Sequence, residues 1–219
     1  MVKFVPQLIN LFATLILLLA FAMISQRRIV SLINLFMLQG AALVAASFLL
    51  AYATHQPDLY VSGALTLVLK VVLIPWMLHR MIAKLNVRWD VETLLNIPTT
   101  LLVGIALVIF AFSLALPVSR LSDSIAGGSL GIALACVFLS FMMMITRSKA
   151  VPQVIGFLSM ENGLIFAATT VTNGMPMIVE FGIALDVLVG VLILGVFMFQ
   201  IREKFDSLDI HHLEVLKDD

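Results

Sequence analysis

Residues 150–172 read AVPQVIGFLSMENGLIFAATTVT, an apolar run that holds a single charged side chain, Glu161. A helix needs roughly 20 apolar residues to cross the hydrocarbon core of a bilayer at about 1.5 Å per residue. The run therefore predicts a membrane-spanning helix. Glu161 stands 11 residues beyond the first residue of the run, which places it near the bilayer midplane.

Six further runs of similar length and apolarity predict a protein built almost entirely from such helices. The chain is 62% hydrophobic and only 12% charged, with a mean hydropathy of +1.13, whereas soluble domains carry about 25% charged residues. We predict an all-α integral membrane protein with seven transmembrane helices. The predicted spans are 4–24, 29–52, 59–82, 94–118, 125–146, 150–172 and 177–201.

The positions of the charges predict how the chain lies in the membrane. The 13 Lys and Arg residues balance 13 Asp and Glu residues, so no net field suggests a nucleic-acid partner. Ten of the cations fall on one side of the predicted spans and only Lys3 and Arg120 on the other. The positive-inside rule then places the N-terminus outside and the C-terminus in the cytoplasm. We expect the membrane to be the cytoplasmic membrane of a bacterium or archaeon.

Two parts of the sequence can be aligned with each other. Residues 28–43 align with 150–165, which matches Gln39 with Glu161, and the next helices match Lys70 with Asp186. Four predicted helices separate the starts of the two copies, so the copies are parallel. We predict an N-terminal three-helix repeat at 1–89, a connector helix at 90–124, a C-terminal repeat at 125–204 and a cytoplasmic tail at 205–219.

Three ionisable residues are predicted at the same membrane depth: Lys70, Glu161 and Asp186. A charge at the bilayer centre costs about 2.5–3.5 kcal/mol even on lenient scales, so such residues are functional candidates. One interpretation is a proton relay, with Glu180 and Gln39 as secondary candidates. The other is a structural tie in which Lys70 and Asp186 neutralise each other. Both interpretations stay open from the sequence.

Cofactor chemistry finds little support in the sequence. The single cysteine, Cys136, cannot form an internal disulfide or a thiolate cluster, and His55, His211 and His212 lack further ligands nearby. We therefore expect no metal or cofactor in this chain.

Pro75, five residues after Lys70, removes a backbone donor and predicts a local irregularity in the helix.

The run IGFLSMENG at 155–163, the segment ALD at 184–186 followed by Gly190, and SLDI at 207–210 carry a resemblance to a family. Residues 150–219 resemble the K subunit of respiratory NADH:quinone oxidoreductase and the C subunit of multisubunit Na⁺/H⁺ antiporters. In that family, an acid in each of two helices relays protons, and these positions fall here on Glu161 and Asp186. The second acid is Asp rather than the more usual Glu, and the N-terminal copy has neither acid.

Over its full length the chain is similar to the component E family of hydrogenase-4 type formate hydrogenlyase complexes. The resemblance implies a membrane subunit of a [NiFe]-hydrogenase complex in which formate oxidation and hydrogen evolution drive ion translocation. It also implies antiporter-like membrane subunits and a hydrophilic hydrogenase arm as partners, with the [NiFe] centre and iron–sulfur clusters in those partners. The alternatives are a structural spacer without proton transfer and an autonomous small-molecule carrier.

Overall fold

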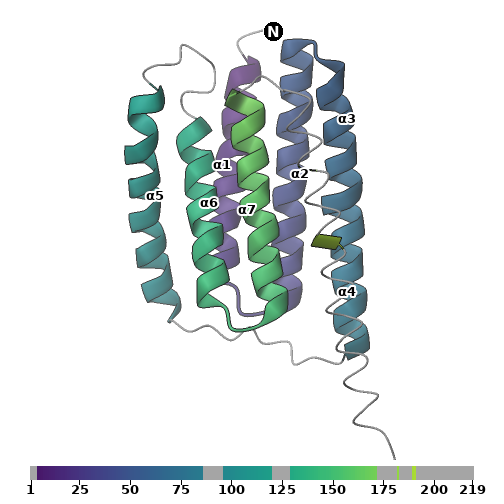
Figure 1. The fold of residues 1–219 in the computed structure, drawn as a ribbon, viewed down its shortest axis with the longest axis vertical. Coiled ribbons are helices and arrows are strands. Elements are labelled where there is room, and N and C mark those ends of the chain that lie inside the picture. Colours follow the sequence, from purple (N-terminus) through teal and green to yellow (C-terminus); the bar gives the residue numbers. More distant parts are fainter. Residues whose placement is uncertain (1–3, 86–95, 120–128, 172–181, 183–188, 191–219) are drawn as a thin grey trace, which may run out of the picture.

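The computed structural model describes residues 4–85, 96–119, 129–171, 182 and 189–190. These residues form long helices joined by short connectors (Figure 1). The helices are α1 (Phe4–Ser25), α2 (Ile29–Thr54), α3 (Pro57–Thr66), α4 (Ile74–Leu85), α5 (Ile97–Ser119), α6 (Ser129–Thr146) and α7 (Ala150–Val171). A π-helical segment, η1 (Leu67–Leu73), joins α3 to α4 without a break.

Within the described residues, six helical segments are long and apolar enough to cross a membrane, counting α3, η1 and most of α4 as one. Their all-helical character is what a bilayer requires, because a helix pairs its own backbone groups where no water is present. They confirm a multi-pass helical membrane protein and match the first six predicted spans within a few residues. The seventh predicted span, 177–201, lies outside the described residues except for Gly182, Val189 and Gly190, which are helical.

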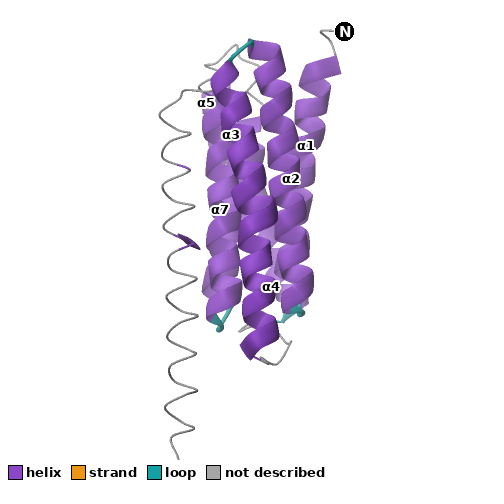
Figure 2. Ribbon diagram, turned by 90° about the vertical axis from the view of Figure 1, so that its right-hand side faces the viewer, coloured by secondary structure: helices purple, strands orange, loops and turns teal. Residues whose placement is uncertain are grey.

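Two helical hairpins form the centre of the structure. The α1–α2 hairpin lies beside the α6–α7 hairpin, so that α1 contacts α6 and α2 contacts α7. The α5 helix packs on α6 and α1, and the α3–η1–α4 helix packs on α2 (Figures 1 and 2). Large apolar side chains such as Phe36, Leu139 and Leu158 fill the shared core.

The directions of the helices agree with a parallel arrangement of the two hairpins. The α1 and α6 helices run the same way along the bundle, as do α2 and α7 (Figure 1). This is the geometry that the predicted parallel duplication requires. The duplication itself, and the boundaries at 89, 124 and 204, stay predictions.

Glycines bring the helices of the second hairpin close together. A Cβ atom at Gly156 would lie 2.9 Å from the Cγ atom of Met144, and one at Gly163 would lie 3.2 Å from the Cβ atom of Cys136. Small residues that allow such approach are a common basis of helix association in membranes, where burial of apolar surface supplies no driving force.

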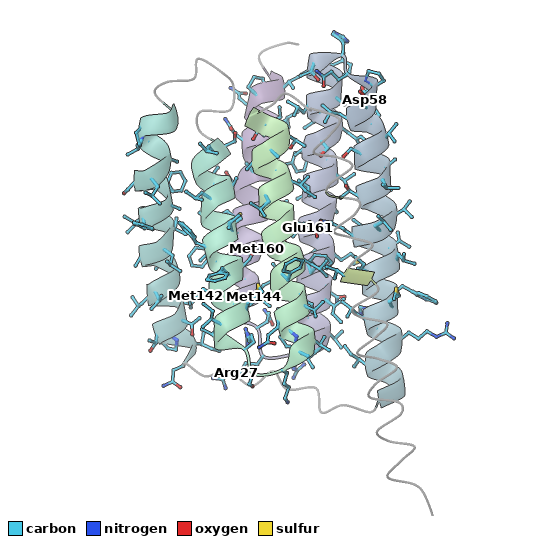
Figure 3. All side chains as sticks on the ribbon, in the orientation of Figure 1. Arg27, Asp58, Met142, Met144, Met160 and Glu161 are labelled. Atoms are coloured by element: carbon cyan, nitrogen blue, oxygen red, sulfur yellow. The ribbon has the colours of Figure 1, made fainter. Side chains whose placement is uncertain are left out.

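Charged connectors gather at one end of the bundle. The connectors 26–28 and 147–149 lie together there, and we call this the basic end; Asp58 lies at the opposite end (Figure 3). The charge sorting inferred from the sequence is therefore present in the fold. Which end faces the cytoplasm remains an inference from the positive-inside rule.

Arg147 is buried at the basic end, although it stands in a short connector between two helices. Its residue exposure is only 2%, and its Nη2 atom donates hydrogen bonds to the carbonyl oxygens of Met23 and Ile24, at 3.2 and 2.7 Å. Burial lowers the pKa of Arg147 to about 10, so the side chain stays charged at neutral pH. The cation thus caps the C-terminal end of α1, where helix carbonyls lack partners within their own helix.

Candidate functional site

A buried ion pair lies at the middle of the bundle. The Nζ atom of Lys70 is 3.2 Å from Oε2 of Glu161, and the two side chains are 0% and 2% exposed. Figure 3 shows Glu161 well inside the bundle, between Asp58 at one end and Arg27 at the other. Lys70 and Glu161 are the charged side chains at mid-depth in the described part of the chain.

Burial makes this pair interdependent. Each ion loses several kcal/mol of hydration when it leaves water, and only a close partner of opposite charge restores a comparable amount. Removal of either partner would therefore leave an expensive buried charge or force the remaining group to become neutral. Each charge of the pair therefore depends on the other for its stability in the interior.

The local structure around Lys70 is a π-helix. The Ile74 N–H bonds to the carbonyl of Leu69, five residues earlier, instead of the usual four. Pro75 follows immediately, and it has no N–H to offer and would crowd the carbonyl four residues before it. The wider turn accommodates the proline, and π segments of this kind are frequent at functional sites. The sequence predicted an irregularity near Pro75 but not its form.

Gly40 of α2 lets η1 come close to the neighbouring helix. A Cβ atom at this position would stand 3.4 Å from Cγ2 of Val71 and 3.6 Å from Cβ of Lys70. A larger side chain would push η1 away from α2. The glycine therefore sets the position from which Lys70 reaches toward α7.

Two buried amides lie beside the ion pair. Asn162, next to Glu161, donates through Nδ2 to Oε1 of Gln39 at 3.2 Å, and Gln39 donates through Nε2 to the carbonyl of Ile16 at 3.4 Å. Both amides are fully buried. Gln39 was predicted as a secondary relay residue; the structure places it in a hydrogen-bonded link that joins α1, α2 and α7. An amide does not titrate near neutral pH, so Gln39 can orient groups but not carry the charge.

A hydroxyl pair joins the two helices of the second hairpin. The hydroxyl oxygens of Ser140 and Ser159 are 2.7 Å apart, and both residues are buried. Sequence reasoning missed this contact and the Asn162 link. Each of these residues is a polar residue at mid-depth within an apolar run, and that pattern could have revealed them. The sequence analysis considered depth only for ionisable side chains.

The predicted relay residues meet with different outcomes. The structure brings Lys70 and Glu161 together, whereas the predicted structural tie paired Lys70 with Asp186. Asp186 and Glu180 lie outside the described residues. The contact between Lys70 and Glu161 is one that the sequence analysis did not single out. The tie between Lys70 and Asp186 stays a prediction.

The contact between Lys70 and Glu161 brings a proton donor and a proton acceptor together. Among the described residues, no group of three His, Cys, Asp or Glu side chains lies close enough to hold a metal ion. An ammonium and a carboxylate in direct contact form a donor and an acceptor between which a proton passes without an intervening group. Functional protonation of this kind is typical of intramembrane acids and lysines that face a protein interior.

Comparison with known proteins gives one relative of similar length. The chain is 32% identical over 194 residues to the uncharacterized protein Rv0085 of Mycobacterium tuberculosis, and the match covers 88% of each chain. No family model matches the chain. No solved structure matches it.

Proposed function

We propose that this chain, which belongs to the same family as the mycobacterial protein Rv0085, is a non-redox membrane subunit of an ion-translocating [NiFe]-hydrogenase complex of the formate hydrogenlyase type. In this role Lys70 and Glu161 take part in a proton relay. The buried ion pair at mid-depth carries the proposal. The resemblance of residues 150–219 to the K subunit of NADH:quinone oxidoreductase supports the type of complex.

The ion pair supports a relay because its two groups can exchange a proton without changing the net charge of the pair. Lys70 as ammonium with Glu161 as carboxylate carries no net charge, and neither does the neutral amine with the carboxylic acid. A charge that appears nearby, for example on a partner subunit, would favour one state over the other. The pair would then release or accept a proton in response to events elsewhere in the complex.

In this proposal, the redox chemistry belongs to partner subunits. The resemblance assigns the [NiFe] centre and the iron–sulfur clusters to those partners, and the antiporter-like subunits would exchange protons laterally with Glu161 and Asp186. The contribution of this chain is a titratable path within a lipid-sealed bundle.

The test is the substitution Glu161→Gln in the whole complex. Gln keeps the size of the side chain and its hydrogen-bonding capacity but cannot titrate. We expect the complex to assemble while proton translocation, measured by a pH-sensitive dye in sealed inverted vesicles, falls at least about tenfold, within the range of measured general acid–base contributions. Glu161→Asp serves as the matched control, because it keeps a titratable carboxyl. Normal translocation by the Gln variant would rule out the relay.

The ion pair also favours a second function, a structural spacer in the same complex. A contact between η1 and α7 ties distant parts of the chain together whether or not it moves protons. The double exchange Lys70→Glu with Glu161→Lys separates the two roles. A spacer would regain assembly and full translocation once the charges are paired again, whereas a relay whose direction depends on the positions of donor and acceptor would regain assembly alone.

A further inference from the structure

The buried side of the α3–η1–α4 helix changes its chemistry at Lys70. Toward the end of the bundle at which α3 begins, the buried positions at four-residue intervals are Thr66 and Ser62, which are 8% and 7% exposed. Toward the basic end, the buried positions at the same intervals are Ile74, Leu78 and Ile82, each at most 2% exposed. Between Leu59, which is fully buried near the start of α3, and Lys70, this stripe has hydroxyl groups, whereas on the other side of the lysine it has branched aliphatic groups.

The two hydroxyls differ from most others in the described helices. Hydroxyl groups in apolar helices usually donate to a carbonyl three or four residues earlier. Thr66 and Ser62 have no such bond, and within the described part of the chain neither hydroxyl has a hydrogen-bond partner. The hydroxyls that do bond back in this way belong to Thr14, Ser25, Ser47, Thr54, Thr100, Ser113, Thr146, Thr169 and Thr170.

The spacing of these groups fits single water molecules between them. Four residues of helix advance about 6 Å along the axis, and one water that bridges two polar groups spans nearly the same distance with two hydrogen bonds of about 2.8 Å. Ser62, Thr66 and Lys70 are therefore spaced as consecutive stations for water. A buried hydroxyl without a protein partner is the kind of group that such water satisfies.

On the basic-end side of the ion pair, the buried hydroxyls of Ser140 and Ser159 bond to each other, and most of the other buried residues are apolar. On α2, the buried residues between Gln39 and the basic end include Phe36, Ile33 and Leu32, and on α7 those below Glu161 include Leu158 and Ile155. All five are fully buried and belong to the apolar core, as do Ile74, Leu78 and Ile82. Tightly packed aliphatic and aromatic side chains exclude water.

We propose that water and protons reach the Lys70–Glu161 pair from the end at which α3 begins, along Ser62 and Thr66, and that Ile74, Leu78 and Ile82 seal the pair from the basic end. This one-sided access adds a route to the proposed proton relay. Its functional meaning rests on that proposed function. If the basic end faces the cytoplasm, the pair exchanges protons with the outer side, and transfer toward the cytoplasm must pass laterally through a neighbouring group.

Cysteine labelling in sealed vesicles of both orientations tests this access directly. The sole cysteine is first replaced, Cys136→Ala, and single cysteines are introduced into the full chain in its native complex as Thr66→Cys, Ser62→Cys, Ile74→Cys and Leu78→Cys. The probe is a cationic, membrane-impermeant methanethiosulfonate. Because the thiolate is the reacting species and forms only in contact with water, positions 62 and 66 should react at least about tenfold faster than positions 74 and 78. They should do so only from the side at which α3 begins.

Lipid-facing neighbours provide the matched controls. Val68, which is 54% exposed on the outer surface of the helix, lies at nearly the depth of Thr66, so Val68→Cys is the control for Thr66→Cys. Val61, which is 65% exposed, lies at nearly the depth of Ser62, so Val61→Cys is the control for Ser62→Cys. Co-purification of partner subunits shows that each variant assembles. Should Thr66→Cys fail to assemble, Ser62→Cys against Val61→Cys makes the same comparison.

Two results would overturn the one-sided access. One is labelling at 66 or 62 that does not exceed that of its lipid-facing control. The other is labelling at 74 or 78 as fast as at 66. The relay is judged separately, because Glu161→Gln can abolish or preserve translocation without changing which cysteines water reaches.

Discussion

The two central hairpins differ at the positions that the sequence alignment matches. In the α1–α2 hairpin the position is Gln39, whose amide is satisfied by neutral hydrogen bonds to Ile16 and Asn162. In the α6–α7 hairpin the position is Glu161, whose carboxylate contacts the ammonium of Lys70. The comparison teaches that similar backbone positions in this bundle tolerate either an amide or an acid, and that the acid is present where a cation reaches it.

The largest effect is expected from removing that cation. Lys70→Met keeps the length of the side chain but leaves Glu161 buried without this partner, and breaking a buried pair in this way typically costs about 3–5 kcal/mol. We expect much lower thermal stability of the solubilised complex. The double variant Lys70→Met with Glu161→Met should recover most of the loss, since it removes both charges of the pair. A single variant as stable as the unmodified chain would show that the pair is not interdependent.

A smaller effect is expected at the contact between the two hairpins at the basic end. Arg147→Leu removes charge-assisted hydrogen bonds to the carbonyls of Met23 and Ile24, which are worth about 1.5–3 kcal/mol each. We expect a lower unfolding temperature in detergent. Arg147→Lys should show an intermediate loss, because an ammonium lacks the planar fork of the guanidinium.

The pH dependence of this loss follows from the pKa of Arg147. Burial lowers the pKa of Arg147 to about 10, well below its ordinary value. The unfolded chain therefore binds more protons than the folded chain only between these values, and the contribution of this group to the unfolding free energy rises with pH only there. Between about pH 6 and pH 8, the Arg147→Leu loss should stay constant. A loss that changes across this interval would mean that another group titrates with the contact.

The smallest effect is expected at Gln39. Gln39→Met removes the link to Asn162 and to the carbonyl of Ile16, and a neutral hydrogen bond contributes about 0.5–1.5 kcal/mol. We expect a modest decrease in the unfolding temperature with proton translocation nearly unchanged, measured in the vesicle assay used for Glu161→Gln. Loss of translocation equal to that of Glu161→Gln would mean that the two hairpins share the relay equally.

Much of the fold followed from the sequence because membrane helices can be recognised from the length and apolarity of a run of residues. The described spans lie within a few residues of their predicted positions, and the depth of Lys70 and Glu161 followed from counting residues along each helix. The basic connectors were correctly grouped at one end, but the burial of Arg147 was not foreseen, since a cation in a short connector gives no sign of the helix end beside it.

The arrangement of side chains around the pair did not follow from the sequence. Hydropathy places each residue at a depth but not at an angle around the bundle, so three ionisable residues at one depth allowed several pairings, and the contact between Lys70 and Glu161 was not singled out. The π-helical turn before Pro75 and the close approach at Gly40 orient Lys70 toward Glu161. Neither feature can be recognised from the depth at which its residues lie in the membrane.

The sequence by itself determined that this chain is a bundle of membrane helices with a few charges at its midplane, because the bilayer imposes one length scale and one solvent on every span. Only the tertiary structure decided which of those charges meet, which amides and hydroxyls surround them, and which half of the bundle is packed with aliphatic side chains. Those choices depend on helix rotation and close packing, which small residues and a single proline control through contacts between segments far apart in the chain.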